Sequence, residues 1–174
     1  MIYAVPKSVM PKKLKSTFCA VLLLMVSATV CAEQKADLVV VRKSESRLSL
    51  EKDGKAFASF NVAFGAHPQG HKQQQGDERT PEGVYTLDSK NAGSAFYKAL
   101  HVSYPNANDI GGAKARGVDP GGAIMVHGQK NGFGWSAFVV QLFNWTDGCI
   151  ALSNHDMDIV WSAVDAGTPI KTLP

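Results

Sequence analysis

A cysteine and a histidine, each beside a glycine, are the residues of this sequence whose types and spacing could do chemistry. His127-Gly128 ends an apolar run that begins at Ile124, and Gly148-Cys149 follows further along the chain. A thiol activated by a nearby imidazole is a nucleophile and base for acyl transfer. The alternative is a buried free cysteine that packs as a small hydrophobe, with a histidine that only ends a strand. The spacing alone does not decide between these two interpretations.

The first 32 residues have the pattern of a secretory signal peptide. An apolar run from Phe18 to Val30 follows four lysines, and Val30-Cys31-Ala32 resembles a cleavage site. The run is too short to span a bilayer. A lipoprotein lipidated at Cys31 is the alternative, but valine is larger than that processing usually accepts before the cysteine. We therefore predict that residues 1–32 are removed on export and that residues 33–174 form a single domain.

Removal of this segment changes the charge and the cysteine content of the chain. Four of the 18 Lys and Arg residues and none of the 15 acidic residues lie in residues 1–32, which leaves 14 basic against 15 acidic residues. A net charge of −1 predicts no basic surface for nucleic acid. Cys19 and Cys31 leave with the segment, and an unpaired thiol is unusual in an oxidising compartment. Cys149 is therefore predicted to be a reactive thiol.

The elements that must position these two residues are mostly strands. Asp53-Gly54 is a strong signal for a two-residue hairpin, and the stretches around it alternate polar and apolar residues. Residues 65–79 have no apolar period and predict a long loop, a kind of segment that is often functional. Strands are expected at residues 37–43, 47–52, 55–64, 84–87, 99–104, 123–126, 150–152 and 169–172.

Three segments raise the question of helices. Bulky residues at a helical period in residues 133–143 predict an amphipathic helix that packs on the sheet. Ser153 with Asp156 resembles a capping box for a helix that runs to about residue 165. In residues 106–117 the charges allow a short surface helix, but Gly111-Gly112 argue against a regular one. The fold class expected is mainly β, with a few short helices in a single domain.

The joint pattern of these motifs resembles the YkuD-like family of L,D-transpeptidase catalytic domains. That family has an HG dipeptide at a strand end, followed after about twenty residues by [S/T]-x-G-C, as here in His127-Gly128 and in residues 146–149. Residues 76–85 (GDERTPEGVY) and 103–106 (SYPN) resemble two further family segments. The match spans roughly residues 38–173, and it implies the β-sandwich or barrel of that family.

The resemblance implies an exported periplasmic enzyme, a cysteine acyltransferase that acts on peptidoglycan stem peptides. Cys149 would attack a meso-diaminopimelate carbonyl and expel D-alanine, leaving a thioester that passes to an amine or to water, with His127 as proton acceptor and donor. No metal and no cofactor are expected, because one cysteine and five scattered histidines give no zinc spacing. The other site residues expected are Gly128, Gly148, Thr146 and Asp147 for the oxyanion and positioning, and Tyr104, Arg79 and His71 for substrate binding.

Two residues depart from the common family pattern. Ala151 stands where many members have Arg or Asn, and Asp147 stands where many have His or another basic residue. A branch of the family with alanine at the first of these positions is linked to hydrolysis. The alternative function is therefore an L,D-carboxypeptidase, or an amidase that releases a peptidoglycan-linked protein, which would make a wall-linked lipoprotein a partner. A non-catalytic cell-wall binding module is a third reading, against which the presence of both Cys149 and His127 argues.

Overall fold

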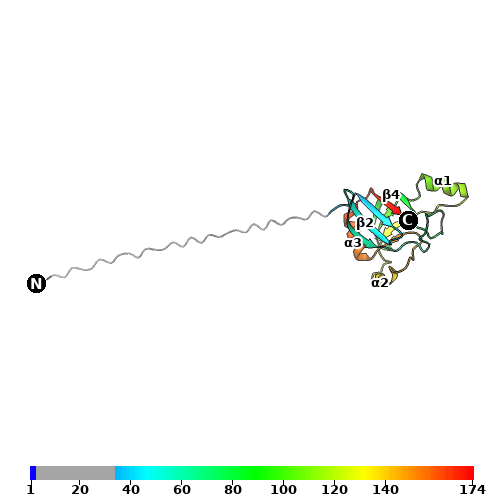
Figure 1. Cartoon of the computed structure of the whole chain (residues 1–174). Helices are drawn as coiled ribbons and strands as arrows, with labels where there is room; N and C mark the ends of the chain where they lie inside the picture. The colour runs from blue at the N-terminus through cyan, green and yellow to red at the C-terminus, as the bar shows by residue number, and fades with distance from the viewer. Residues whose placement is uncertain (3–33) are drawn as a thin grey trace. The chain divides into compact units, whose positions relative to one another are not determined.

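The computed structural model describes residues 1–2 and 34–174 of the chain (Figure 1). The predicted signal peptide therefore lies outside the described residues, apart from its first two. Within the described part, no helix is long and apolar enough to cross a membrane.

Eight strands form one mixed sheet. Most neighbours are antiparallel, but β1 with β8 and β6 with β7 are parallel pairs. The order across the sheet is β3-β2-β1-β8-β4-β5-β6-β7. The strands are β1 (Leu38–Arg42), β2 (Arg47–Lys52), β3 (Lys55–Asn61), β4 (Gly83–Ser94), β5 (Tyr97–Val102), β6 (Met125–His127), β7 (Ile150–Ala151) and β8 (Thr168–Leu173).

The sheet curls so that its two outer strands meet. Just after β3, Ala63 exchanges both backbone hydrogen bonds with Ala151 of β7, at 2.9 and 2.8 Å. Gly65 forms a further bridge with Thr146. Pairing of this kind satisfies backbone groups that an open edge would leave exposed. The mainly β, barrel-like fold that was predicted is confirmed.

The interior of this curled sheet is apolar and continuous. β1 has three consecutive buried valines, Val39 to Val41, whereas β8 alternates buried and exposed residues as a strand with one wet face does. The hairpin predicted at Asp53-Gly54 joins β2 and β3. The largest fully buried side chains include Phe64, Leu48, Leu50, Leu87, Leu100, Leu152, Met157 and Ile170.

Among residues 34–174, three α-helices lie outside the sheet: α1 (Ala107–Arg116), α2 (Ala137–Val140) and α3 (Asn154–Ala163). Figure 1 shows α1 and α2 at separate edges of the domain. α1 forms despite Gly111-Gly112 because Asn106 and Asp109 make a reciprocal capping box at its start. α3 begins at the predicted N-cap, where the Ser153 hydroxyl oxygen accepts from the N–H of Asp156.

The helix predicted for residues 133–143 forms only in part, and its predicted packing on the sheet is wrong. The segment contains a one-turn 3-10 helix, Gly134–Ser136, and the four-residue α2, and neither has a side-chain cap at its start. Isolated helices this short are marginal in water without packing. The expected packing is missing too, because Trp135, Phe138 and Leu142 are 72%, 73% and 75% exposed. The helical spacing of bulky residues here marks an apolar surface, and not a buried face.

Candidate active site

Strand pairing brings His127 and Cys149 to the same place. β6 and β7 pair in parallel, with His127 opposite Ala151, and paired residues of neighbouring strands present their side chains on one face. Cys149 precedes Ala151 by two residues and therefore shares that face. Both His127 and Cys149 line a cavity of about 330 Å³. The sequence motifs predicted that these two residues lie close together.

The imidazole of His127 is held in one tautomer. Its Nδ1 lies 2.6 Å from the carbonyl oxygen of Gly128, which can only accept, so Nδ1 carries the hydrogen. Nε2 then keeps its lone pair. Burial lowers the pKa of His127 below its ordinary value of 6.5, and the hydrogen bond to Gly128 opposes that shift only in part. At neutral pH the ring is therefore an uncharged base.

Cys149 is a partly buried thiol, and it is unpaired. Its Sγ lies 3.7 Å from the carbonyl oxygen of Ala123, which can accept the thiol hydrogen. Burial raises the pKa of the thiol above its ordinary value of 9.0, and the negative charge of Asp147 raises it further. A backbone hydrogen bond at Met125 and the positive charge of Lys72 act in the opposite direction. The resting sulfur is thus protonated, and its activation requires a base.

The side chain of Thr146 stabilises the turn that precedes Cys149. The Thr146 hydroxyl donates to the carbonyl oxygen of Cys149 at 2.7 Å and accepts from the N–H of Gly148 at 3.2 Å. Gly148 has a φ of 120°, and a Cβ there would lie 2.6 Å from the carbonyl oxygen of Arg79. The glycine beside the nucleophile is therefore required by the close approach of the protein's own chain.

Two aromatic side chains that sequence reasoning missed complete the cavity wall. Phe96 lies 4.9 Å from the His127 ring and Trp145 lies 6.0 Å from it, measured between ring centroids. Both line the cavity that contains Cys149. Trp145 adjoins the Thr146 motif, which is a usable signal, whereas Phe96 belongs to the β4–β5 turn and has no local signature.

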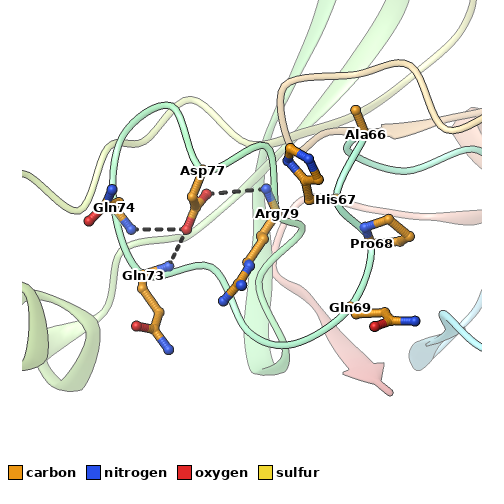
Figure 2. A pocket seen from close by; sticks show the side chains of 8 residues that line it. All are labelled: Ala66, His67, Pro68, Gln69, Gln73, Gln74, Asp77 and Arg79. Atoms are coloured by element: carbon orange, nitrogen blue, oxygen red, sulfur yellow. Dashed lines mark hydrogen bonds between the residues drawn. The ribbon is translucent and has the colours of Figure 1, made fainter.

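The long loop predicted at residues 65–79 adjoins the turn before Cys149 and forms a second cavity of about 610 Å³ (Figure 2). The Ala66 N–H donates to the carbonyl oxygen of Thr146, which joins the loop to the turn before Cys149. Asp77 organises the loop by accepting from the backbone N–H groups of Gln73, Gln74 and Arg79. Arg79 thus lies next to the Cys149 turn through its backbone, and its side chain lines the second cavity.

The other two predicted substrate-binding residues lie elsewhere. His71 accepts from the N–H of Glu82 through Nδ1 and contacts Asp109 through Nε2 at 3.0 Å. Tyr104 is 3% exposed, and its hydroxyl donates to the carbonyl oxygen of Pro120. Neither lines the cavity of Cys149. Of the predicted site residues, His127, Thr146, Asp147 and Cys149 line that cavity, with Gly128 and Gly148 adjoining them in the chain.

No group of three or more His, Cys, Asp or Glu side chains suited to a metal ion occurs among residues 1–2 and 34–174. The features that define the site are therefore a thiol, an imidazole and their aromatic wall on a curled mixed sheet. These features are those of a cysteine-containing β domain.

The chain belongs to the L,D-transpeptidase catalytic domain family, YkuD, whose model matches residues 36–171. It is 31% identical over 108 residues to an Escherichia coli (strain K12) protein named "Putative L,D-transpeptidase YafK", a match that covers 61% of this chain and 36% of that protein. The recognition made from the motifs is confirmed.

Solved structures have the same fold. The helical cell shape determining protein Pgp2 from Campylobacter jejuni has a TM-score of 0.59 and 28% identity, covering 78% of this chain and 46% of that one. An L,D-transpeptidase from Mycobacterium tuberculosis H37Rv has a TM-score of 0.52 and 20% identity, covering 79% and 57%. The chain thus spans about half, or less, of the length of YafK and Pgp2.

Proposed function

We propose that this chain is a peptidoglycan-modifying cysteine acyltransferase of the L,D-transpeptidase family, with Cys149 as nucleophile and His127 as base. The observation that carries the proposal is the pairing of β6 with β7, which puts a neutral imidazole and a protonated thiol in one cavity. Membership of the family supports stem peptides as the substrate class.

The proposed reaction begins with a proton transfer. His127 Nε2 takes the thiol proton as Sγ of Cys149 attacks the carbonyl carbon of the diaminopimelate residue. The C–N bond to D-alanine breaks, and the leaving amine takes the proton from His127. The resulting thioester then passes its acyl group to an amine or to water, whose proton His127 accepts before returning it to the sulfur.

Several contacts support these roles. The Nδ1 bond to Gly128 fixes the ring, so that the basic nitrogen is the other one. The Thr146 hydrogen bonds hold the main chain on both sides of Gly148. Phe96 and Trp145 keep one wall of the cavity apolar, which disfavours charge on either reacting group before substrate arrives. These features favour an enzyme over a binding module, because a module has no need of a poised base.

Hydrolysis is the second candidate outcome of the thioester, and Ala151 is the observation that favours it. Ala151 is completely buried, and both its backbone N–H and its carbonyl oxygen are hydrogen-bonded to Ala63. It does not line the cavity of Cys149, so it offers an acceptor amine no group for orientation. Water needs much less orientation than an amine does. An L,D-carboxypeptidase or an amidase that releases a wall-linked protein would use the same two residues.

Intact-mass spectrometry tests the nucleophile and its base together. The protein is incubated with a carbapenem or with a purified tetrapeptide muropeptide, and the mass of one acyl adduct is expected. Cys149→Ala should give none. His127→Gln should acylate roughly 10²–10⁴-fold more slowly while remaining folded. Normal turnover by Cys149→Ala would overturn the proposal.

The products separate the competing activities. Release of a tripeptide identifies a carboxypeptidase, crosslinked dimers identify a transpeptidase, and release of a covalently attached protein identifies an amidase. We also propose periplasmic export, supported by the lysine-rich and apolar pattern of residues 1–32. N-terminal sequencing of the exported protein should begin near Glu33, and an intact Met1 on the exported protein would contradict removal of the segment.

A further inference from the structure

The side chain of Arg79 has an unusual environment. The residue is partly buried, and its guanidinium makes no hydrogen bond or ion pair with any residue that the structure describes. Its hydrogen bond to Asp77 is made by the backbone N–H. An arginine has five side-chain N–H donors and is always charged. A guanidinium held in a cavity with its donors unused is suited to a ligand that supplies oxygen acceptors.

The neighbouring cations are already engaged. Lys72 is 3% exposed and donates to Asp77 at 2.8 Å, while Lys43 is 4% exposed and donates to Glu82 at 2.7 Å. Although burial raises the pKa of Asp77, hydrogen bonds from the Gln73 N–H and from Lys72 hold it below its ordinary value of 3.8. The Asp77 charge is therefore balanced by Lys72 and leaves Arg79 available.

The cavity around Arg79 is lined by three side-chain amides together with Ala66, His67, Pro68 and Asp77. Figure 2 shows its side chain reaching into the space enclosed by the loop, between Gln73 and Gln69. Gln74 lines the same cavity of about 610 Å³. Side-chain amides both donate and accept, so they suit the amide groups of a peptide backbone. Gly70 lies close to the guanidinium, because a Cβ there would be 3.6 Å from one of its nitrogens.

We propose that Arg79 and the amides of Gln69, Gln73 and Gln74 form a carboxylate-binding subsite for a stem peptide. The ligand class rests on the proposed function. Arg79 would make a two-pronged bond to a peptide carboxylate other than that of the terminal D-alanine, and the glutamines would bond to the neighbouring amides. The subsite would determine which peptides are bound, and it takes no part in the chemical steps.

The subsite is joined rigidly to the nucleophile. The Arg79 carbonyl lies against Gly148, close enough that a side chain at Gly148 would collide with it. On the other side of the cavity, Ala66 is hydrogen-bonded to Thr146. A peptide held by Arg79 is thus positioned relative to the turn that presents Cys149. Positioning of this kind is how remote contacts contribute to a reaction.

Calorimetric binding of two synthetic peptides to the Cys149→Ala protein tests the subsite without turnover. One peptide is a tetrapeptide stem with free carboxylates, and in the other every carboxylate except that of D-alanine is a carboxamide. Arg79→Gln should weaken binding of the acidic peptide about 10- to 100-fold, the range for a hydrogen bond to a charged group. The amidated peptide should bind the parent protein more weakly than the acidic peptide does, and Arg79→Gln should not weaken its binding further.

Two further variants complete the design. Arg79→Lys keeps the charge and loses the planar fork, so an intermediate affinity is expected. Arg47→Gln removes an exposed arginine at the start of β2 and should bind both peptides as the parent does. Thermal unfolding of each variant verifies that the fold is kept.

The outcomes distinguish the subsite from the proposed function. Equal effects of Arg79→Gln on both peptides, or no effect on either, would overturn the subsite even if wild-type protein turns stem peptides over. Arg79-dependent binding of the acidic peptide would support the subsite, and absence of any acyl product with the wild-type protein would then overturn only the proposed reaction.

Discussion

The imidazole of His127 donates to the carbonyl oxygen of Gly128 over 2.6 Å, a bond between neighbours in the chain. It makes the ring's second nitrogen the basic one in the cavity that also contains Cys149. Because burial holds the pKa of His127 below 6.5 and that of Cys149 above 9.0, neither group is charged at neutral pH. The pair is therefore a neutral base and a thiol, and not a preformed thiolate and imidazolium.

On the acid side, the midpoint of the pH dependence of acylation should be lower than the ordinary histidine pKa of 6.5. His127 must be unprotonated to accept the thiol proton, and its pKa is below 6.5. The midpoint of the decline in carbapenem acylation of Cys149 should thus lie below pH 6.5. Rates measured by mass spectrometry across pH 4–8 check this. A midpoint above 6.5 would contradict it.

The same shift should affect stability. The pKa of His127 is lower in the folded state than its unfolded value of 6.5. As pH falls through 6.5, the unfolded state therefore binds more protons than the folded state, which favours unfolding. The contribution of His127 is therefore fully present above pH 6.5 and is lost progressively down to the folded-state pKa. Urea unfolding should show a shallower decline below pH 6.5 in His127→Gln than in the parent. Parallel curves would show that His127 does not contribute.

Alkylation should report the raised pKa of the thiol. The rate of iodoacetamide reaction with Cys149 should rise with a midpoint above pH 9.0. Asp147→Asn removes a nearby negative charge and should increase the rate at pH 8 by about twofold to fivefold, since an exposed charge is screened by salt. Asp53→Asn, in the β2–β3 turn, is the control. A slower reaction in Asp147→Asn would contradict the electrostatic effect.

Sequence reasoning succeeded where local chemistry determines local structure. Asp53-Gly54 specified a hairpin, and Ser153 specified a helix start, because a turn and a cap are each satisfied by residues close in the chain. The family recognised from the motifs is confirmed, and the two motif residues His127 and Cys149 line one cavity. The long loop at residues 65–79 was also predicted, and it contains no helix and no strand longer than a single bridge.

It failed where distant parts of the chain decide the outcome. The bulky residues of 133–143 have a helical period, but the curled sheet already fills its core and leaves no face for them. Phe96 reaches the cavity only because β4 and β5 carry their turn beside β6. The contact of Gly148 with Arg79 joins segments far apart in sequence, so the reason for that glycine could not be read from the motif.

Asp109 should be important for stability. Its carboxylate accepts from the Tyr85 hydroxyl at 2.9 Å and from the Asn106 N–H at 2.9 Å, and it contacts His71 at 3.0 Å. Burial, followed by the contact with Asp109, raises the pKa of Tyr85. Asp109→Ala should lower the free energy of unfolding by about 2–4 kcal/mol, since the buried Tyr85 and the partly buried Asn106 and His71 lose an acceptor. Urea unfolding measures the change.

The control for Asp109 is Asp119→Ala, which removes one exposed hydrogen bond to the Gly121 N–H. Its effect should be within about 1 kcal/mol. Equal losses in the two variants would show that the Asp109 contacts have no special weight.

The exposed apolar segment gives the sharpest test of the structure against the sequence pattern. If Trp135 and Phe138 formed the buried face of a helix, replacing either by serine would cost about 3–5 kcal/mol, as Phe64→Ala should at a fully buried position. Their side chains are instead 72% and 73% exposed, so Trp135→Ser and Phe138→Ser should each change the free energy of unfolding by less than about 0.5 kcal/mol. Urea unfolding of the three variants gives the comparison. Losses of several kcal/mol in Trp135→Ser would mean that the segment is packed in solution.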